Sequence, residues 1–112
     1  MATAKLIVMF PRPKNEEEFE RLYREQYAPL VETAGNKALL VEAKVIAAPL
    51  GPMPHYRITE IHFPTRKELE DCLRSQRGQR AILQAVRISS GGAPVFLIAE
   101  EQAAAFRKME ST

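Results

Sequence analysis

The chain has 112 residues, of which 46% are apolar and 27% charged, with one cysteine and a formal net charge of +2. A chain of this length forms one domain and buries enough surface to fold without disulfides. A single cysteine excludes a disulfide-stapled scaffold, and this apolar content with so small a net charge excludes intrinsic disorder.

The first two predicted elements are a strand and a long helix. Residues 4–10 form an apolar, β-branched run closed by Pro-Arg-Pro, which predicts a buried strand. Asn15 then offers an N-cap for an amphipathic helix, which we expect to kink or end at Pro29 and to stop at Gly35. Its apolar spacing is carried by Phe19, Leu22, Tyr23, Gln26, Tyr27 and Leu30.

Two further strands follow this helix. Residues 37–48 are predicted as a second strand, and the Pro/Gly-rich stretch at 49–54 as a loop, because proline and glycine are poor strand-interior residues. Residues 55–63 are rich in β-forming residues and predict a third strand.

The rest of the chain is predicted to form a second helical arm and a fourth strand. Thr65 opens a second helical arm that we expect Gly78 to interrupt, and residues 95–99 predict the last strand before a polar tail. The order β-α-β-β-α-β is that of the ferredoxin-like α+β fold, an antiparallel four-stranded sheet with both helices on one face.

The second face of this sheet should not be solvated. Residues 6–10 and 95–99 are apolar at both odd and even positions, whereas a strand with one wet face alternates. No third helix is available as a cover. We therefore expect a homodimer through the open sheet face, packed sheet to sheet.

Four segments resemble the EthD family, named after a protein of ethyl tert-butyl ether degradation. They are residues 5–13 (Lys-Leu-Ile-Val-Met-Phe-Pro-Arg-Pro), 19–23 (Phe-Glu-Arg-Leu-Tyr), 28–30 (Ala-Pro-Leu) and 75–79 (Ser-Gln-Arg-Gly-Gln). The resemblance implies a dimeric α/β barrel. It also implies one EthD-like domain over residues 1–112, with a core at about 4–101 and a polar tail at 102–112.

The resemblance leaves the reaction open. Related barrels include cofactor-free monooxygenases, muconolactone-type isomerases, polyketide cyclases and haem-handling enzymes, so the fold alone does not choose between them. Many EthD members carry His-x-x-His on the first helix, where this chain has Arg24 and Tyr27. Since arginine is neither a general base nor an ordinary metal ligand, a mechanism resting on those histidines does not transfer.

Glu60 and His62 form the best catalytic candidate. They lie two residues apart on the third predicted strand, on one face together with Tyr56. A carboxylate beside an imidazole fixes its tautomer and raises its basicity, as a general base requires. A hydrogen-bonded pair at the dimer interface gives the same pattern and is the more common case.

The predicted binding residues are Tyr23, Tyr27, Arg24, Tyr56 and Arg12. The two helix tyrosines lie one turn apart with Arg24 beside them, and could line an apolar pocket that has a few polar groups. They could equally be core residues with satisfied hydroxyls. Arg12, held between two prolines, could meet an anionic group, although a surface salt bridge is the commoner role.

No cofactor or metal is expected, because the sequence has two histidines and no zinc-binding or phosphate-binding motif. Haem binding would lack a second ligand. The basic residues form no stripe for nucleic acid, since an acidic first helix balances a basic second one. No apolar run is long enough to span a membrane, and a cytoplasmic location is expected.

Two function classes follow. The first is a homodimer that binds a small apolar organic molecule, with cofactor-independent oxidation or isomerisation as its reaction if it is an enzyme. The second is a non-catalytic dimeric accessory or ligand-binding module. A vacant helix–sheet cleft with His62 facing into it would favour the enzyme, and a filled cleft would favour the module.

Overall fold

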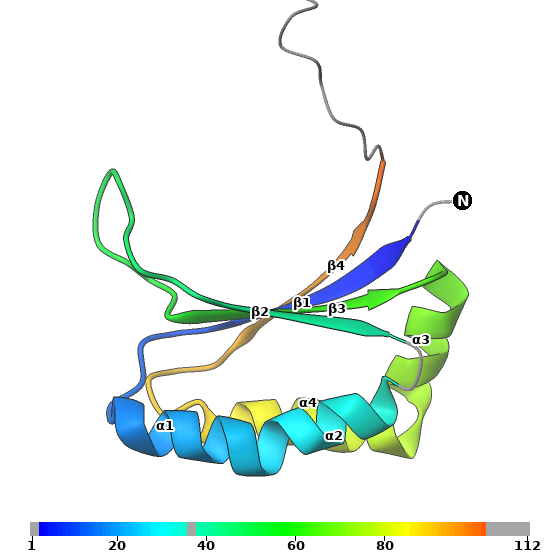
Figure 1. Cartoon of the computed structure of the whole chain (residues 1–112), viewed down its shortest axis with the longest axis horizontal. Helices are drawn as coiled ribbons and strands as arrows, with labels where there is room; N and C mark the ends of the chain where they lie inside the picture. Colours follow the sequence, from blue (N-terminus) through cyan, green and yellow to red (C-terminus); the bar gives the residue numbers. More distant parts are fainter. Residues whose placement is uncertain (1–2, 36–37, 103–112) are drawn as a thin grey trace, which may run out of the picture.

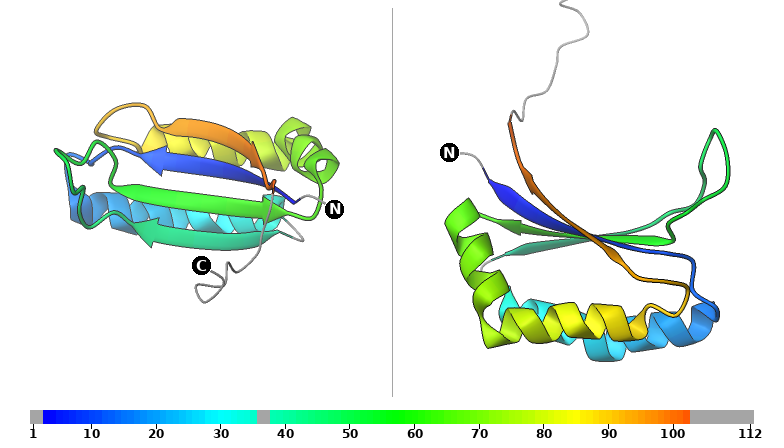
Figure 2. Two further views of the ribbon diagram at one scale, coloured as in Figure 1. Left: turned by 90° about the horizontal axis from the view of Figure 1, so that it is seen from above. Right: turned by 180° about the vertical axis from the view of Figure 1, so that it is seen from behind.

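A computed structural model describes residues 3–35 and 38–102, and the strands within them form one antiparallel sheet in the order β2-β3-β1-β4 (Figure 1). The elements in chain order are β1 (Ala4–Phe10), α1 (Glu16–Leu22), η1 (Tyr23–Tyr27), α2 (Ala28–Ala34), β2 (Leu39–Lys44), β3 (Arg57–Phe63), α3 (Arg66–Arg74), α4 (Gln76–Ile88) and β4 (Val95–Glu100). The helices cover one face of the sheet (Figure 2), so the predicted α+β ferredoxin-like fold is confirmed.

The first helix does not end at Pro29. Asn15 caps it as predicted, with its side-chain oxygen accepting from the Glu18 N–H at 3.0 Å. The helix then widens into the π-helical turn η1 and continues as α2, where Pro29 occupies the first turn. Proline has no N–H to donate and its ring collides with the carbonyl four residues earlier, and the wider π turn relieves both conflicts.

The π turn also keeps the apolar side of this helix on the sheet. The buried positions recur every four residues, at Phe19, Tyr23, Tyr27 and Val31, whereas an α-helix repeats every 3.6. The helix has to be wound more slowly to hold all four side chains on one face. Leu22 and Leu30 pack only partly against this core, and Gln26 is exposed, so the predicted stripe was too wide.

The second helical arm breaks at Ser75, three residues before the predicted break at Gly78. Ser75 ends α3 in an extended conformation and caps α4, because its hydroxyl oxygen accepts from the Gly78 N–H at 3.0 Å. The same hydroxyl donates to the Cys72 carbonyl at 2.6 Å. Gly78 therefore lies inside the first turn of α4, where it permits a close backbone approach.

The strands of the middle segment are shorter than predicted. β2 covers Leu39–Lys44 and β3 begins at Arg57. Residue 37 lies outside the described residues. The start of β3 decides where the Tyr56 side chain lies. Tyr56 is in the bend before the strand, so it does not follow the side-chain alternation of β3.

The face of the sheet opposite the helices, here called the open face, is covered by no described element. Strand pairing places alternate residues of all four strands on it, and these are mostly apolar. Leu39 is 63% exposed and Leu97 45%. The residues of the open face are Lys5, Ile7, Met9, Leu39, Val41, Ala43, Ile58, Glu60, His62, Val95, Leu97 and Ala99.

Within the described part of the chain, no helix has the length and apolar character needed to cross a membrane.

Candidate functional site

An apolar pocket lies between the sheet and helices α2, α3 and α4. Its free volume is about 20 Å³, which is room for roughly one water-sized molecule, so the helix–sheet interior is almost filled. Its lining comprises Leu6, Val8, Tyr27, Val31, Ala34, Gly35, Ile61, Phe63, Cys72, Leu73, Gly78, Ala81, Ile82 and Phe96.

Tyr27 supplies the one hydroxyl among the described lining residues. The residue is buried, and its hydroxyl makes no hydrogen bond to any residue that the structure describes. Burial, together with the nearby Tyr23 and Glu42, raises the pKa of Tyr27, so the phenol stays neutral and able to donate. The fully buried polar side-chain atoms that lack a partner in the described chain are His55 Nδ1 and Arg57 Nε, so the Tyr27 oxygen is not sealed off from its surroundings. A phenol on an otherwise apolar wall is the kind of polar group that orients a bound molecule.

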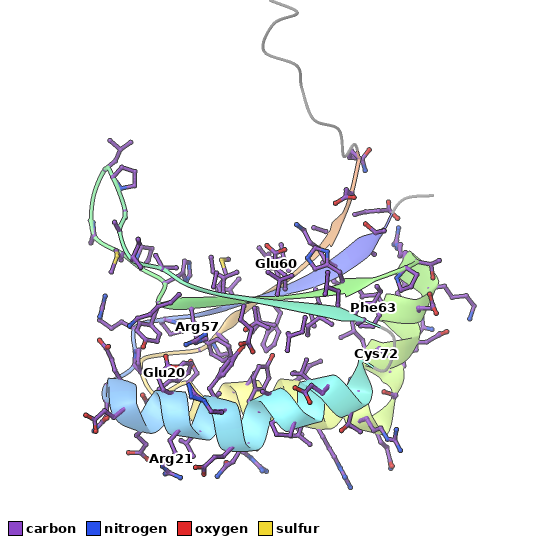
Figure 3. All side chains as sticks on the ribbon, in the orientation of Figure 1. Glu20, Arg21, Arg57, Glu60, Phe63 and Cys72 are labelled. Carbon is purple, nitrogen blue, oxygen red and sulfur yellow. The ribbon has the colours of Figure 1, made fainter. Side chains whose placement is uncertain are left out.

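The other titratable lining residue among those described is Cys72. Burial raises the pKa of its thiol, which donates weakly to the Ala34 carbonyl at 3.4 Å. It lies in the space between α3 and the sheet (Figure 3). A neutral thiol on an apolar wall behaves as a small apolar side chain, and not as a nucleophile.

A charged cluster lies at the other end of the helix–sheet layer. Glu20, on α1, accepts from the Arg57 guanidinium at 2.6 Å and from the Tyr56 hydroxyl at 2.7 Å. Burial alone raises the pKa of Glu20, but these two hydrogen bonds and the positive charges of Arg57 and Lys44 together outweigh it and lower the pKa below the usual 4.5. Burial and Glu20 in turn raise the pKa of Tyr56 to about 12. Glu20 is thus a carboxylate fixed by two donors.

Arg57 ties this cluster to the aromatic core. Its guanidinium lies 4.6 Å from the Tyr23 ring centroid. The Tyr23 hydroxyl bonds to Thr59 at 2.7 Å and donates to Glu42 at 3.0 Å. Helix η1 is therefore joined to β2 and β3 by polar bonds as well as by packing, and Tyr23 stands behind the pocket instead of lining it.

Glu60 and His62 lie on the open face of the sheet, away from the pocket. Their side chains form the predicted pair, with Glu60 Oε1 2.8 Å from His62 Nε2, and Lys5 Nζ lies 3.3 Å from the same oxygen. Figure 3 shows Glu60 on the open side of the sheet and Arg57 on the helix side. Because the sheet separates it from the pocket, this pair does not touch a molecule bound there.

The prediction that Tyr56 shares the face of Glu60 and His62 was wrong. Tyr56 is buried and packs edge-on against Phe19, on the helix side. Its N–H donates to the Phe10 carbonyl, which fixes the bend before β3. The alternation of side chains in β3 therefore starts at Arg57, one residue after Tyr56, and does not place Tyr56 on the face of Glu60 and His62.

The two predicted arginines lie outside the pocket. The Arg24 side chain is exposed, and its nearest carboxylate is Glu20 at 4.0 Å. Arg12 forms a salt bridge with Glu16 at 2.9 Å. A surface salt bridge is the role that we expected to be commoner for this residue than anion binding. Its guanidinium also lies 5.8 Å from the Tyr56 ring centroid. Roles for either arginine in ligand binding remain predictions.

In the described residues, no group of three or more His, Cys, Asp or Glu side chains is arranged to hold a metal ion.

Comparison with known proteins gives similarity in structure alone. No family model and no curated protein matches the chain. An EthD family protein from Bacillus halodurans superposes with a TM-score of 0.80 at 21% identity, over 89% of this chain and 99% of that one. The fold is that of an EthD-like protein. The resemblance seen in the sequence is thereby confirmed for the fold.

Two other solved structures share this architecture. A dimeric ferredoxin-like protein of unknown function from Jannaschia has a TM-score of 0.69 at 12% identity, covering 88% of this chain and 99% of its own. A putative antibiotic biosynthesis monooxygenase from Caulobacter crescentus has a TM-score of 0.57 at 15% identity, covering 93% and 91%. One of these proteins has no described function and the other is described as a putative monooxygenase, so the shared fold does not assign a function.

Four polar residues of this EthD-like fold were not predicted from the sequence: Glu20, Arg57, Thr59 and Glu42. Arg57 carried a usable signal, because it shares strand parity with Thr59, Ile61 and Phe63, which face the helices. A charged residue at a core-facing position needs a buried partner. That partner, Glu20, lies 37 residues away on an acidic helix, where nothing local distinguishes it from exposed glutamates.

Proposed function

We propose that this protein is a homodimeric binding module for a small, largely apolar organic molecule that carries a hydrogen-bond acceptor. The observation that carries the proposal is the apolar pocket lined by Tyr27, the one hydroxyl-bearing residue of its described lining, whose hydroxyl makes no hydrogen bond to a described residue. Ligand sites are typically apolar enclosures with few polar groups. At about 20 Å³, the pocket admits a ligand only if half-buried lining residues such as Leu73, Ile82 and Phe96 move aside.

Binding is favoured over catalysis in this pocket. Its two titratable described residues, Tyr27 and Cys72, both have raised pKa values and are neutral at pH 7, so neither is a base. The Glu60–His62 pair lies across the sheet. A cofactor-independent oxidation or isomerisation is the second candidate, and the likeness to the Caulobacter protein, described as a putative antibiotic biosynthesis monooxygenase, supports the oxidation.

The ligand proposal is tested by titrating small phenols, quinones and lactones into ¹⁵N-labelled protein. We expect chemical-shift changes at pocket residues. We also expect Tyr27→Phe to weaken binding of carbonyl-bearing probes by about threefold to tenfold, the value of one hydrogen bond. Toluene, which has no acceptor, should bind both proteins equally. Tyr23→Phe is the control, because that hydroxyl is occupied by Thr59 and Glu42. Shifts confined to the surface, or none, would contradict the proposal.

The homodimer is proposed to form through the open face. Support comes from the exposed leucines and valines of that face and from the dimeric description of the Jannaschia protein. Contiguous apolar surface of this kind marks an interaction site. A two-fold dimer brings the same apolar face from both copies together.

Leu97→Arg should raise the dimer dissociation constant by about tenfold or more, because it places an unpaired charge in the interface. Light scattering should give about twice 12.6 kDa for the wild type and a concentration-dependent fall towards one chain for the variant. Leu83→Arg is the control. Leu83 lies on α4 and is 55% exposed, close to the 45% of Leu97. A monomeric wild type at micromolar concentration would refute the dimer.

A further inference from the structure

We propose that the two copies exchange ion pairs, with Lys5 of each copy bound to Glu60 of the other. The inference rests on the proposed homodimer and specifies how its interface is registered. It assigns an intermolecular role to the polar group on the open face, here called the Lys5–Glu60–His62 cluster.

This cluster lies on the two central strands of the open face, in the middle of its width and towards one end of its length. Lys5 is directly opposite His62 in the β1–β3 pairing, and these strands are the two central ones of the sheet. On the flanking strands, Leu39 and Val41 lie opposite His62 and Glu60, and Ala99 lies opposite Lys5. The charged groups are therefore framed by apolar side chains on both sides.

The contacts within one chain leave the cluster incompletely bonded. Glu60 Oε1 contacts both Lys5 and His62, and no described residue donates to Glu60 Oε2. The Lys5 ammonium has three donors and makes one described contact. The three side chains are 25–29% exposed, so water reaches the remaining groups in the single chain.

A second sheet laid over this face removes that water, and the remaining donors and acceptor then need partners. In a two-fold interface each copy presents the same surface. The groups left over on one copy, an ammonium and a carboxylate oxygen, are complementary to those left over on the other. An interface of apolar side chains alone tolerates sliding, whereas a paired charge within it fixes one register.

The test mixes two charge-reversal variants, Lys5→Glu and Glu60→Lys. Each variant alone brings like charges together across the interface. In a mixed dimer, the carboxylate introduced at position 5 of one chain meets the ammonium introduced at position 60 of the other. The native Glu60 of the first chain meets the native Lys5 of the second. Both contacts across the interface are then attractive, whereas the pairing within each chain stays unfavourable.

Native mass spectrometry of one ¹⁵N-labelled and one unlabelled variant gives the readout. We expect the ratio of mixed dimer to homodimers to exceed its statistical value by about tenfold. Opposite charges across the interface stabilise the mixed dimer, and like charges destabilise both homodimers. The control mixes Lys67→Glu with Glu70→Lys, which make the same changes in net charge on α3 in the helix layer. These should mix statistically.

Statistical mixing of the Lys5 and Glu60 variants, with a dimeric wild type, would overturn the ion-pair exchange and leave the homodimer standing. A monomeric wild type would overturn the homodimer, and the exchange with it. Preferential mixing of the control pair as well would also overturn the exchange, because net charge alone would then account for the result.

Discussion

Gly78→Ala is expected to destabilise the protein by about 3 kcal/mol, at the upper end of the range for overpacking. A Cβ atom at this position would overlap the Cys72 carbonyl group, since it would lie 2.8 Å from the carbonyl carbon and closer still to the oxygen. The Ser75 side chain bonds to both sides of this turn, so the two helices cannot separate without losing those bonds.

Gly51→Ala is the matched control. A Cβ there meets nothing within 4 Å, and we expect a change within about 1 kcal/mol. Urea unfolding of both variants measures the difference. Because Gly78 and Cys72 also line the pocket, the Gly78 variant should lose ligand binding. Equal stability of the two variants would show that the α3–α4 turn is looser than the structure has it.

Arg57→Met should cost about 3 kcal/mol, because it leaves the Glu20 carboxylate without its main partner. The Glu20 side chain is 25% exposed and that of Arg57 12%, so water replaces little of the lost interaction. Arg24→Met is the control. Arg24 also approaches Glu20, but at 4.0 Å from an exposed position, and its removal should cost less than about 0.5 kcal/mol.

The same pair has a pH signature. The pKa of Glu20 is lowered in the folded state, because the Arg57 and Tyr56 hydrogen bonds and the charges of Arg57 and Lys44 together outweigh the opposing effect of burial. Its contribution to stability is therefore present above the unfolded value of about 4.5 and is lost as pH falls through the lower folded value. The difference in unfolding free energy between wild type and Arg57→Met should shrink below about pH 4.5. A constant difference would contradict the ion pair.

The sequence predicts much of this fold because its strongest signals are local. Apolar runs mark the strands, and the Asn15 and Thr65 caps mark the helix starts, where both side chains accept the expected backbone hydrogen bonds. The break at Ser75 was misplaced because glycine is the more familiar interruption. A serine three residues before a glycine was the better signal, since it caps the following helix.

The candidate site was less predictable because its contacts are distant in sequence. Apolar helix spacing is enough to direct Tyr27 towards the sheet, but Glu20 and Arg57 lie 37 residues apart on separate layers. The Glu60–His62 contact was predictable from strand spacing alone. The face of the sheet on which this pair lies could not be predicted, because apolar residues occur on both faces and only the packing of the helices distinguishes them.

The π turn η1 has a consequence for the length of the first helix. Phe19 and Val31 are 12 residues apart, which in a regular α-helix would turn them about 120° away from each other. With one residue fewer between them the offset falls to about 20°. A homologue that lacks one residue within η1, and that has no proline at the position of Pro29, would thus form an unbroken α-helix and still direct both side chains to the sheet. With Pro29 replaced, a single-residue deletion at this turn is therefore expected to preserve the core-facing side of the helix, whereas a deletion elsewhere in the helix would rotate that side into water.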